Sequence, residues 1–173
     1  NPIFHTNQRK QGNLFFFYPN IYKIVYCARK CFTSPDKIIN QTKSKIFFSV
    51  ATLEYLQKGG RIGLVSSILG NALKLNPIIS CNEDGIYHTV AKSRGRKKSL
   101  EKTVSLVKAY VGDHKKVRLV VAHGNAEKEA LILIEVLKAA IPQASEVLFG
   151  QISPALVVHT GPGLIGLGAQ LLD

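Results

Sequence analysis

The chain has 173 residues, of which 46% are hydrophobic and 20% are charged, as in an ordinary folded domain with one core. A total of 23 Lys and Arg against 11 Asp and Glu gives a formal net charge of +12, which indicates an anionic partner: a nucleic acid, a phosphate group, a membrane face or an acidic protein. No apolar run reaches the ~18 residues that a membrane-spanning helix requires, so we expect no stable insertion into a membrane.

The first part of the chain, residues 1–33, is rich in aromatic and basic residues and contains no acidic residue. The chain has no Met and begins at Asn1, so we expect a fragment, a processed form or an incomplete gene model. We therefore interpret residues 1–33 as an atypical remnant of a truncated upstream domain. A segment that stacks on single-stranded nucleic acid and a targeting peptide are the alternatives.

The three cysteines, Cys27, Cys31 and Cys81, make an odd number, and no second Cys/His pair stands at the spacing of a zinc site. Free thiols in a reducing compartment are the simpler interpretation. This favours a cytoplasmic protein without a metal cofactor.

From Ser34 onward the sequence alternates between strand and helix patterns, and Ser34-Pro35 is itself typical of a helix start. Asp84-Gly85, between two strand-like runs, predicts a β-hairpin. The run at 116–124 is almost entirely apolar, as in a strand covered on both faces. In the first half we expect a strand over 45–50, a helix over 53–58 capped by Thr52, a helix over 64–73 ended by Asn76-Pro77, and the hairpin strands on either side of 83–84. A helix over 99–111 follows, and then strands over 116–124 and 146–152 with a helix over 126–141 between them. The chain ends with a short helix over 154–158 and a last strand over 164–172, whose glycines permit close approach.

The second half of this pattern, strand, helix, strand, helix and strand, is a crossover α/β unit. The predicted fold class is therefore α/β, with a mixed sheet, crossover helices and an inserted β-hairpin. Residues 34–173 form this domain.

The run LEYLQKGGRIG at 53–63 places two glycines and an arginine where a helix ends. Gly59 offers the left-handed C-cap, and Gly60 leaves an approachable backbone beside Arg61. Together with Gly63 they form a bare backbone turn next to a fixed cation, which suits an anion. An ordinary C-cap is the alternative interpretation.

The run KSRGRKK at 92–98 has five cations among seven residues and precedes a helix. Arg94 and Arg96 can fork onto phosphate oxygens, and Lys97 acts as a point charge. Cations at a helix N-terminus oppose the macrodipole, so anion binding explains them better than a purely structural role. Contact with an RNA or DNA backbone and a localisation signal stay open as alternatives.

A rigid Gly-Pro-Gly turn centred on Pro162 follows a short predicted helix and holds one imidazole, that of His159, at a defined place. This imidazole, the Thr160 hydroxyl and the bare amides of Gly161 and Gly163 are suitable donors for a carboxylate. An unperturbed imidazole titrates near pH ~6.5, so His159 could gain charge on meeting an anion. A turn histidine satisfied by a backbone carbonyl is the alternative.

Motifs of the common enzyme classes are missing from the sequence, which has no Gly-x-Ser-x-Gly elbow, no Gly-Lys-Ser/Thr phosphate loop and no recognisable acid/base pair. His123-Gly124 follows an apolar strand at the loop where α/β proteins place ligands, but no nucleophile accompanies it. We therefore expect a non-catalytic protein.

Three sequence blocks occur together and in this order: LEYLQKGGRIG at 53–63, the stretch from NPIIS at 76–80 to KSRGRKK at 92–98, and HTGPG at 159–163. The combination resembles the C-terminal half of the DegV family, bacterial fatty-acid-binding proteins that serve as lipid carriers for fatty acid kinase. The likeness runs from about Ser34 to the C-terminus. It implies the C-terminal domain of a two-domain α/β fold, with an acyl chain buried in a tunnel between the domains.

The resemblance also implies a division of labour. The carrier binds a long-chain fatty acid without a cofactor and presents its carboxylate to a separate, ATP-dependent fatty acid kinase subunit. The site residues it implies are His159, Thr160, Gly161 and Gly163 at the carboxylate, the cations Arg61, Arg94, Arg96 and Lys97 facing the mouth and the kinase, and Gly59, Gly60, Gly63 and Pro162 in the backbone turns.

The chain departs from the family on its N-terminal side, because the Thr-Asp-Ser and Thr-Ser motifs of the family's first domain are not found. The hydroxyls of those motifs also bind the carboxylate. The resemblance therefore implies that half of the tunnel is missing and that the isolated chain binds fatty acids weakly or not at all. A basic nucleic-acid-binding module, using the +12 charge, residues 1–33 and the RGRKK patch, is the alternative function.

Overall fold

The computed structural model describes residues 43–60, 62, 75–82 and 86–173. The strands are β1 (Ser44–Ser49), β2 (Leu75–Cys81), β3 (Tyr87–Arg94), β4 (Val117–Gly124), β5 (Ala144–Gln151) and β6 (Leu164–Leu171), and the helices are α2 (Glu54–Lys58), α3 (Arg96–Val111), α4 (Glu127–Ala140) and α5 (Pro154–Thr160). Residues 1–33, the helices expected at Ser34 and over 64–73, the hairpin turn, Arg61 and Gly63 lie outside the described residues.

These strands form one six-stranded sheet in the order β3-β2-β1-β6-β4-β5. β2 and β3 are the expected hairpin, and β4 and β5 are a parallel pair connected through α4. β6 enters the centre of the sheet antiparallel to both β1 and β4, so the crossover unit is β4-α4-β5 and does not extend to the last strand. The predicted class, α/β with a mixed sheet and an inserted hairpin, is confirmed.

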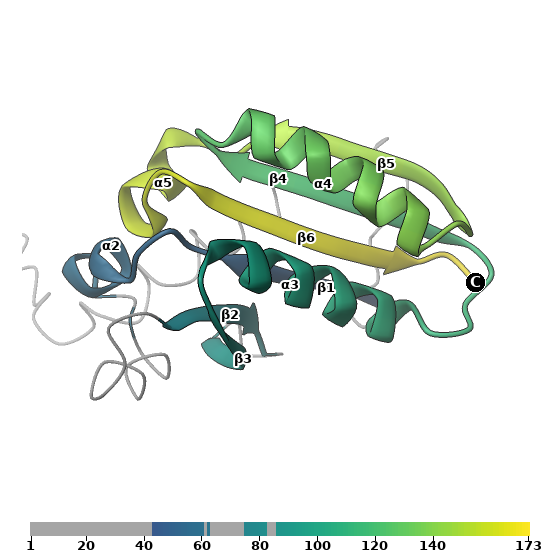
Figure 1. The fold of residues 1–173 in the computed structure, drawn as a ribbon, viewed down its shortest axis with the longest axis horizontal. Helices are drawn as coiled ribbons and strands as arrows, with labels where there is room; N and C mark the ends of the chain where they lie inside the picture. Colours follow the sequence, from purple (N-terminus) through teal and green to yellow (C-terminus); the bar gives the residue numbers. More distant parts are fainter. Residues whose placement is uncertain (1–42, 61, 63–74, 83–85) are drawn as a thin grey trace, which may run out of the picture.

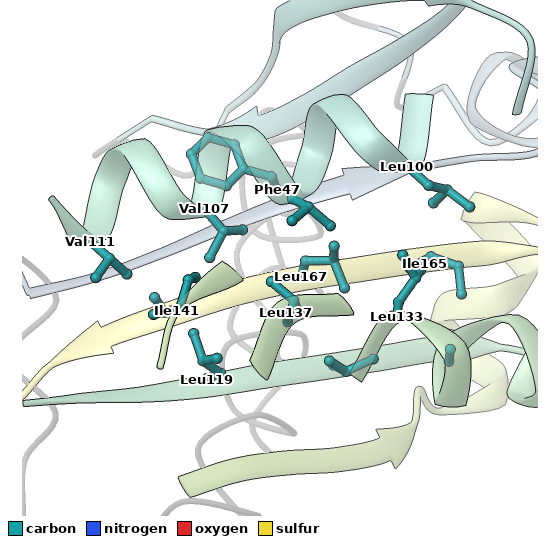
Figure 2. Close-up of a cluster of buried hydrophobic side chains, with 14 of the residues drawn as sticks. Phe47, Leu100, Val107, Val111, Leu119, Leu133, Leu137, Ile141, Ile165 and Leu167 are labelled. Atoms are coloured by element: carbon teal, nitrogen blue, oxygen red, sulfur yellow. The ribbon is translucent and has the colours of Figure 1, made fainter. Parts of the chain in front are cut away.

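The main core lies between the sheet and the helices α3 and α4, which run along the same face (Figure 1). Alternate residues of each strand point to this face and meet the apolar stripe of each helix. Full burial of such side chains contributes roughly 1.5–3 kcal/mol each. The central members are Phe47, Leu100, Val107, Val111, Leu119, Leu133, Leu137, Ile141, Ile165 and Leu167 (Figure 2).

A second apolar cluster uses the alternate residues of the strands and lies at one end of the sheet. Phe48 and Tyr87 meet edge to face, with ring centroids 5.2 Å apart. Leu56 of α2 and Leu156 of α5 belong to the same cluster. This cluster holds both short helices onto the end of the sheet, which matters because helices of this length are not stable alone.

Two element boundaries differ from the prediction and change the setting of the candidate residues. α3 begins at Arg96 rather than at Ser99, because Gly95 takes a φ of 81° and starts the helix there. α5 continues through Thr160, so His159 lies in the last helical turn and not in the turn after it.

The chain is also already a strand at Asn76-Pro77, where a helix end was expected. Pro77 is tolerated because β1 pairs with β2 only from Ile78 to Ser80. On the β1 side, Pro77 therefore occupies an unpaired, edge-like position, where proline is tolerated in a strand.

The glycines of β6 allow its neighbours to approach closely. A Cβ added at Gly168 would lie 2.9 Å from the Lys45 carbonyl oxygen of β1. A methyl group there would push apart two strands at the centre of the sheet.

We predict that Gly168→Ala lowers the free energy of unfolding by about 1–3 kcal/mol, because backbone must move to accept the methyl group. Gly150→Ala in β5 is the matched control, since a Cβ there meets nothing within 4 Å. The control should change stability by about 0.5 kcal/mol or less. Urea denaturation of both variants tests this, and equal effects would contradict the close-approach explanation.

Candidate functional site

The motifs around Gly59 and His159 meet at one end of the sheet, where α2 and α5 lie next to each other (Figure 1). A Cβ added at Gly59 would be 2.9 Å from Nδ1 of His159. A Cβ added at Gly161 would be 2.5 Å from Cδ2 of Tyr55. Two glycines therefore provide the space in which an imidazole and a phenol ring pack against backbone.

The two consecutive glycines after α2 have different roles from those predicted. Gly59 has a φ of −77°, which any residue can adopt, whereas Gly60 takes the left-handed value of 67°. Gly59 donates its N–H to the Tyr55 carbonyl at 2.9 Å, so the helical turn runs one residue further than expected. Gly60 is thus the residue that needs a positive φ, and Gly59 is needed because His159 occupies the place of a side chain.

The backbone amides after α5 are engaged within the protein, which corrects the expectation that they are bare. Gly161 donates its N–H to the Val157 carbonyl at 2.7 Å, and Gly163 donates to the Gly124 carbonyl at 2.6 Å. Pro162 has no N–H to offer. Gly161 and Gly163 instead shape the turn through positive φ values of 81° and 82°.

The Thr160 hydroxyl is engaged as well. Its Oγ1 donates to the Leu156 carbonyl at 3.0 Å, and the residue is buried. Because a hydroxyl has one proton to donate, Thr160 would have to rotate before it could donate to a carboxylate. Of the donors predicted for a carboxylate here, the Gly161 and Gly163 amides and the Thr160 hydroxyl are therefore already engaged within the protein.

His159 lies in the last turn of α5 and is partly buried. A cation is favoured at a helix C-terminus by the macrodipole. The imidazole therefore lies where a positive charge is stabilised, and an approaching anion would add to that stabilisation.

The Arg96 side chain is engaged in bonds within the protein and is not a free surface cation. Its Nη2 donates to the Glu129 carboxylate at 2.8 Å and to the Gly163 carbonyl at 2.5 Å. Arg94 and Lys97 are exposed, and within the described part of the chain neither has an ion-pair partner. Of the predicted mouth cations that the structure describes, Arg94, Arg96 and Lys97, the first and last face solvent.

The N-termini of α3 and α4 also begin at this end of the sheet (Figure 1). Each carries partial positive charge from the unsatisfied amides of its first turn. The first turn of α4 contains Glu127 and Glu129, whereas that of α3 contains no acid. The α3 side of this end is therefore the more favourable one for an anion.

His123 has a structural role in this geometry. It is buried, stacks on Phe149 with ring centroids 5.2 Å apart, and its Nδ1 accepts the Ala126 N–H at 3.4 Å, close to the start of α4.

Burial raises the pKa of the Cys81 thiol to about 12, so this cysteine stays protonated at neutral pH. Among the described residues no group of His, Cys, Asp and Glu could hold a metal ion.

Three residues of this region were not found from the sequence: Tyr55, Gly95 and Glu129. Tyr55 and Glu129 stand in helical runs without a motif of their own, and their partners are distant in sequence. Gly95 stands inside the basic run at 92–98, and nothing in the sequence shows that its backbone conformation starts the helix.

The profile of the DegV family, described as uncharacterised proteins, matches residues 34–171. The chain belongs to the DegV family. The resemblance inferred from the three sequence blocks is thereby confirmed.

The DegV relatives are longer than this chain. A DegV domain-containing protein of Clostridium acetobutylicum is 40% identical over 141 residues, which cover 80% of this chain and 50% of that protein. A fatty-acid-binding DegV family protein from Thermus thermophilus is 28% identical with a TM-score of 0.70, and the match covers 88% of this chain and 57% of that one. A fatty-acid-binding DegV family protein from Streptococcus agalactiae is 26% identical with a TM-score of 0.68, over 90% of this chain and 56% of that one. The chain thus spans about half the length of these DegV relatives.

In the described part of the DegV chain, no helix is both long and apolar enough to cross a membrane.

We predict that Gly161→Ala is more destabilising than Gly95→Ala, and this difference isolates the packing of Tyr55. Both glycines have a φ of 81° with a strongly extended ψ, a conformation that is nearly confined to glycine, so the backbone strain of about 1–3 kcal/mol is shared. A Cβ at Gly95 meets nothing within 4 Å, whereas one at Gly161 meets the Tyr55 ring. Chemical denaturation should show the excess for Gly161→Ala, and Tyr55→Ala should reduce it. An excess that persists without the ring would contradict this assignment.

Proposed function

We propose that this DegV chain binds a long-chain fatty acid and places its carboxylate beside His159. The observation that carries the proposal is the contact between Gly59 and His159, at the end of the sheet where α3 and α4 begin. That end combines an imidazole, two helix N-termini and an apolar cluster. The fatty-acid binding of the Thermus and Streptococcus relatives supports this choice of ligand.

An amphiphilic ligand suits the two environments that meet here. Leu56 and Leu156 belong to the second apolar cluster and come from the same short helices as Gly59 and His159. Burial of an acyl chain contributes ~0.8 kcal/mol per methylene group. A carboxylate cannot be buried without donors, so its place is at the polar edge of this cluster, beside the imidazole.

The proposed carrier presents the carboxylate to a separate fatty acid kinase subunit, and the chain itself does not catalyse the phosphorylation. The sequence has no phosphate-binding loop for ATP. The exposed cations Arg94 and Lys97 would steer an anionic partner to this end of the molecule. The same role is proposed for Arg61 from the sequence alone, since Arg61 lies outside the described residues.

The proposed binding unit is half of a two-domain carrier, since the chain spans about half the length of its DegV relatives. The engaged amides and the engaged Thr160 hydroxyl agree with this, because they leave few donors for a carboxylate. The isolated chain should therefore bind fatty acids weakly, and a second domain would supply the remaining donors.

Competition between palmitate and a fluorescent fatty-acid analogue tests the proposal on the whole 173-residue chain. We expect weak binding that His159→Leu reduces about tenfold, because leucine removes the hydrogen-bond donor that the imidazole would offer the carboxylate. His114→Leu is the matched control, because His114 is exposed and pairs with Asp173, away from α2 and α5. Equal affinities of the two variants would contradict the proposed role of His159.

Two further outcomes would change the proposal in different ways. Stoichiometric lipid retained through purification, seen by native mass spectrometry, would contradict the half-site. Strong, sequence-independent binding to a mixed oligonucleotide, falling steeply as salt is raised, would favour the nucleic-acid alternative and its exposed cations.

A further inference from the structure

We infer that Arg96 and Glu129 form a clamp that positions the turn after α5 and, through it, the imidazole of His159. Neither residue would then contact the ligand; both would be positioning residues. The inference rests on the proposed role of His159, and it assigns to Arg96 a task other than facing a partner.

The first argument is the position of Arg96 in its helix. Arg96 is the first residue of α3, where a cation opposes the macrodipole, and Gly95 provides no side-chain cap. Helix stability therefore does not explain an arginine at this position. Its contacts with other parts of the chain do.

The second argument is the geometry of the guanidinium group. Its Nε and Nη2 both donate to the Glu129 carboxylate, at 3.3 Å and 2.8 Å, and Nη2 also donates to the Gly163 carbonyl. Only 26% of the Arg96 side chain is exposed. A planar group with several donors in fixed directions can bridge two acceptors in this way, whereas a lysine ammonium lacks such a fork.

The third argument is that both polar backbone groups of Gly163 are held. Its carbonyl accepts from Arg96, and its N–H donates to the carbonyl of Gly124, at the end of β4. Gly163 is thus fixed between the N-terminus of α3 and the C-terminal end of β4. The pair of bonds sets the direction in which the chain leaves α5.

The last step links the turn to the imidazole. α5 has seven residues and depends on its neighbours for its position. His159 packs against Gly59 with no spare room, and Gly161 packs against Tyr55. A shift of the turn must therefore move the imidazole relative to α2.

This clamp and a simple mouth cation predict opposite effects of removing Glu129. If Arg96 acts as a free positive charge toward a carboxylate, loss of the neighbouring acid strengthens or preserves fatty-acid binding. If the pair positions the turn, the same loss weakens binding and changes the surroundings of His159.

The test compares Glu129→Ala with Glu127→Ala in the whole chain. Both remove one negative charge from the first turn of α4, but Glu127 is exposed and does not contact Arg96 in the described structure. The first readout is the NMR spectrum of the His159 imidazole without ligand, assigned with His159→Gln. The second readout is palmitate affinity, measured by competition as above.

We expect Glu129→Ala to shift the His159 imidazole resonances and to lower palmitate affinity about tenfold, with Glu127→Ala close to wild type in both. Glu129→Gln, which keeps the side-chain volume, should act in the same direction and serves if Glu129→Ala does not fold. His159 resonances unchanged in folded Glu129→Ala and Glu129→Gln would overturn the clamp. The NMR readout stands even if wild-type chain binds no palmitate, so failure of the clamp and failure of the proposed function are distinguishable.

Discussion

The close packing of α2 against α5 is the constraint on which the site depends. It is possible because glycines stand at the two points of contact, Gly59 under His159 and Gly161 under Tyr55. Both helices are too short to persist alone, so their order comes from this contact and from the apolar cluster beneath them. A side chain at either glycine would separate the elements that hold the imidazole.

Near this contact two helix N-termini come together, but many of the polar groups beside them are engaged within the protein. The N-termini of α3 and α4 begin beside α5, whereas the amides of Gly161 and Gly163, the Thr160 hydroxyl and Nε and Nη2 of Arg96 are used internally. The result is a framework that positions one imidazole, that of His159, beside the apolar cluster. Such a framework suits one wall of a carboxylate site better than a complete site, as expected for a chain that spans about half of its relatives' length.

The sequence predicted the architecture well where local periodicity determines it. The strands at 45–50 and 116–124, the long helix ending near Ile141 and the hairpin were predicted within a few residues, because alternation and apolar stripes reflect which side faces the core. The antiparallel entry of β6 into the centre of the sheet was not predicted, since strand order depends on contacts between distant segments. The start of α3 was missed because Gly95 begins a helix through its conformation and not through a capping side chain.

For the candidate site, the sequence indicated which blocks belong together but not what each group does. His159 and Gly59 were singled out separately, and the structure brings them into contact. Arg96 was expected to be a displayed cation, and the structure pairs it with Glu129 and Gly163. The difference is physical: residue type shows which bonds a group can make, whereas the partner that satisfies it comes from tertiary contacts.

The central claim is that a fatty-acid carboxylate lies beside His159. The most direct measurement is intermolecular NMR contacts between the methylene protons next to the palmitate carboxyl group and the protein. The account predicts contacts to the His159 ring and to the backbone of Gly59, with the rest of the acyl chain near Leu56 and Leu156. Contacts confined to the exposed cations of α3, with none to His159, would contradict it.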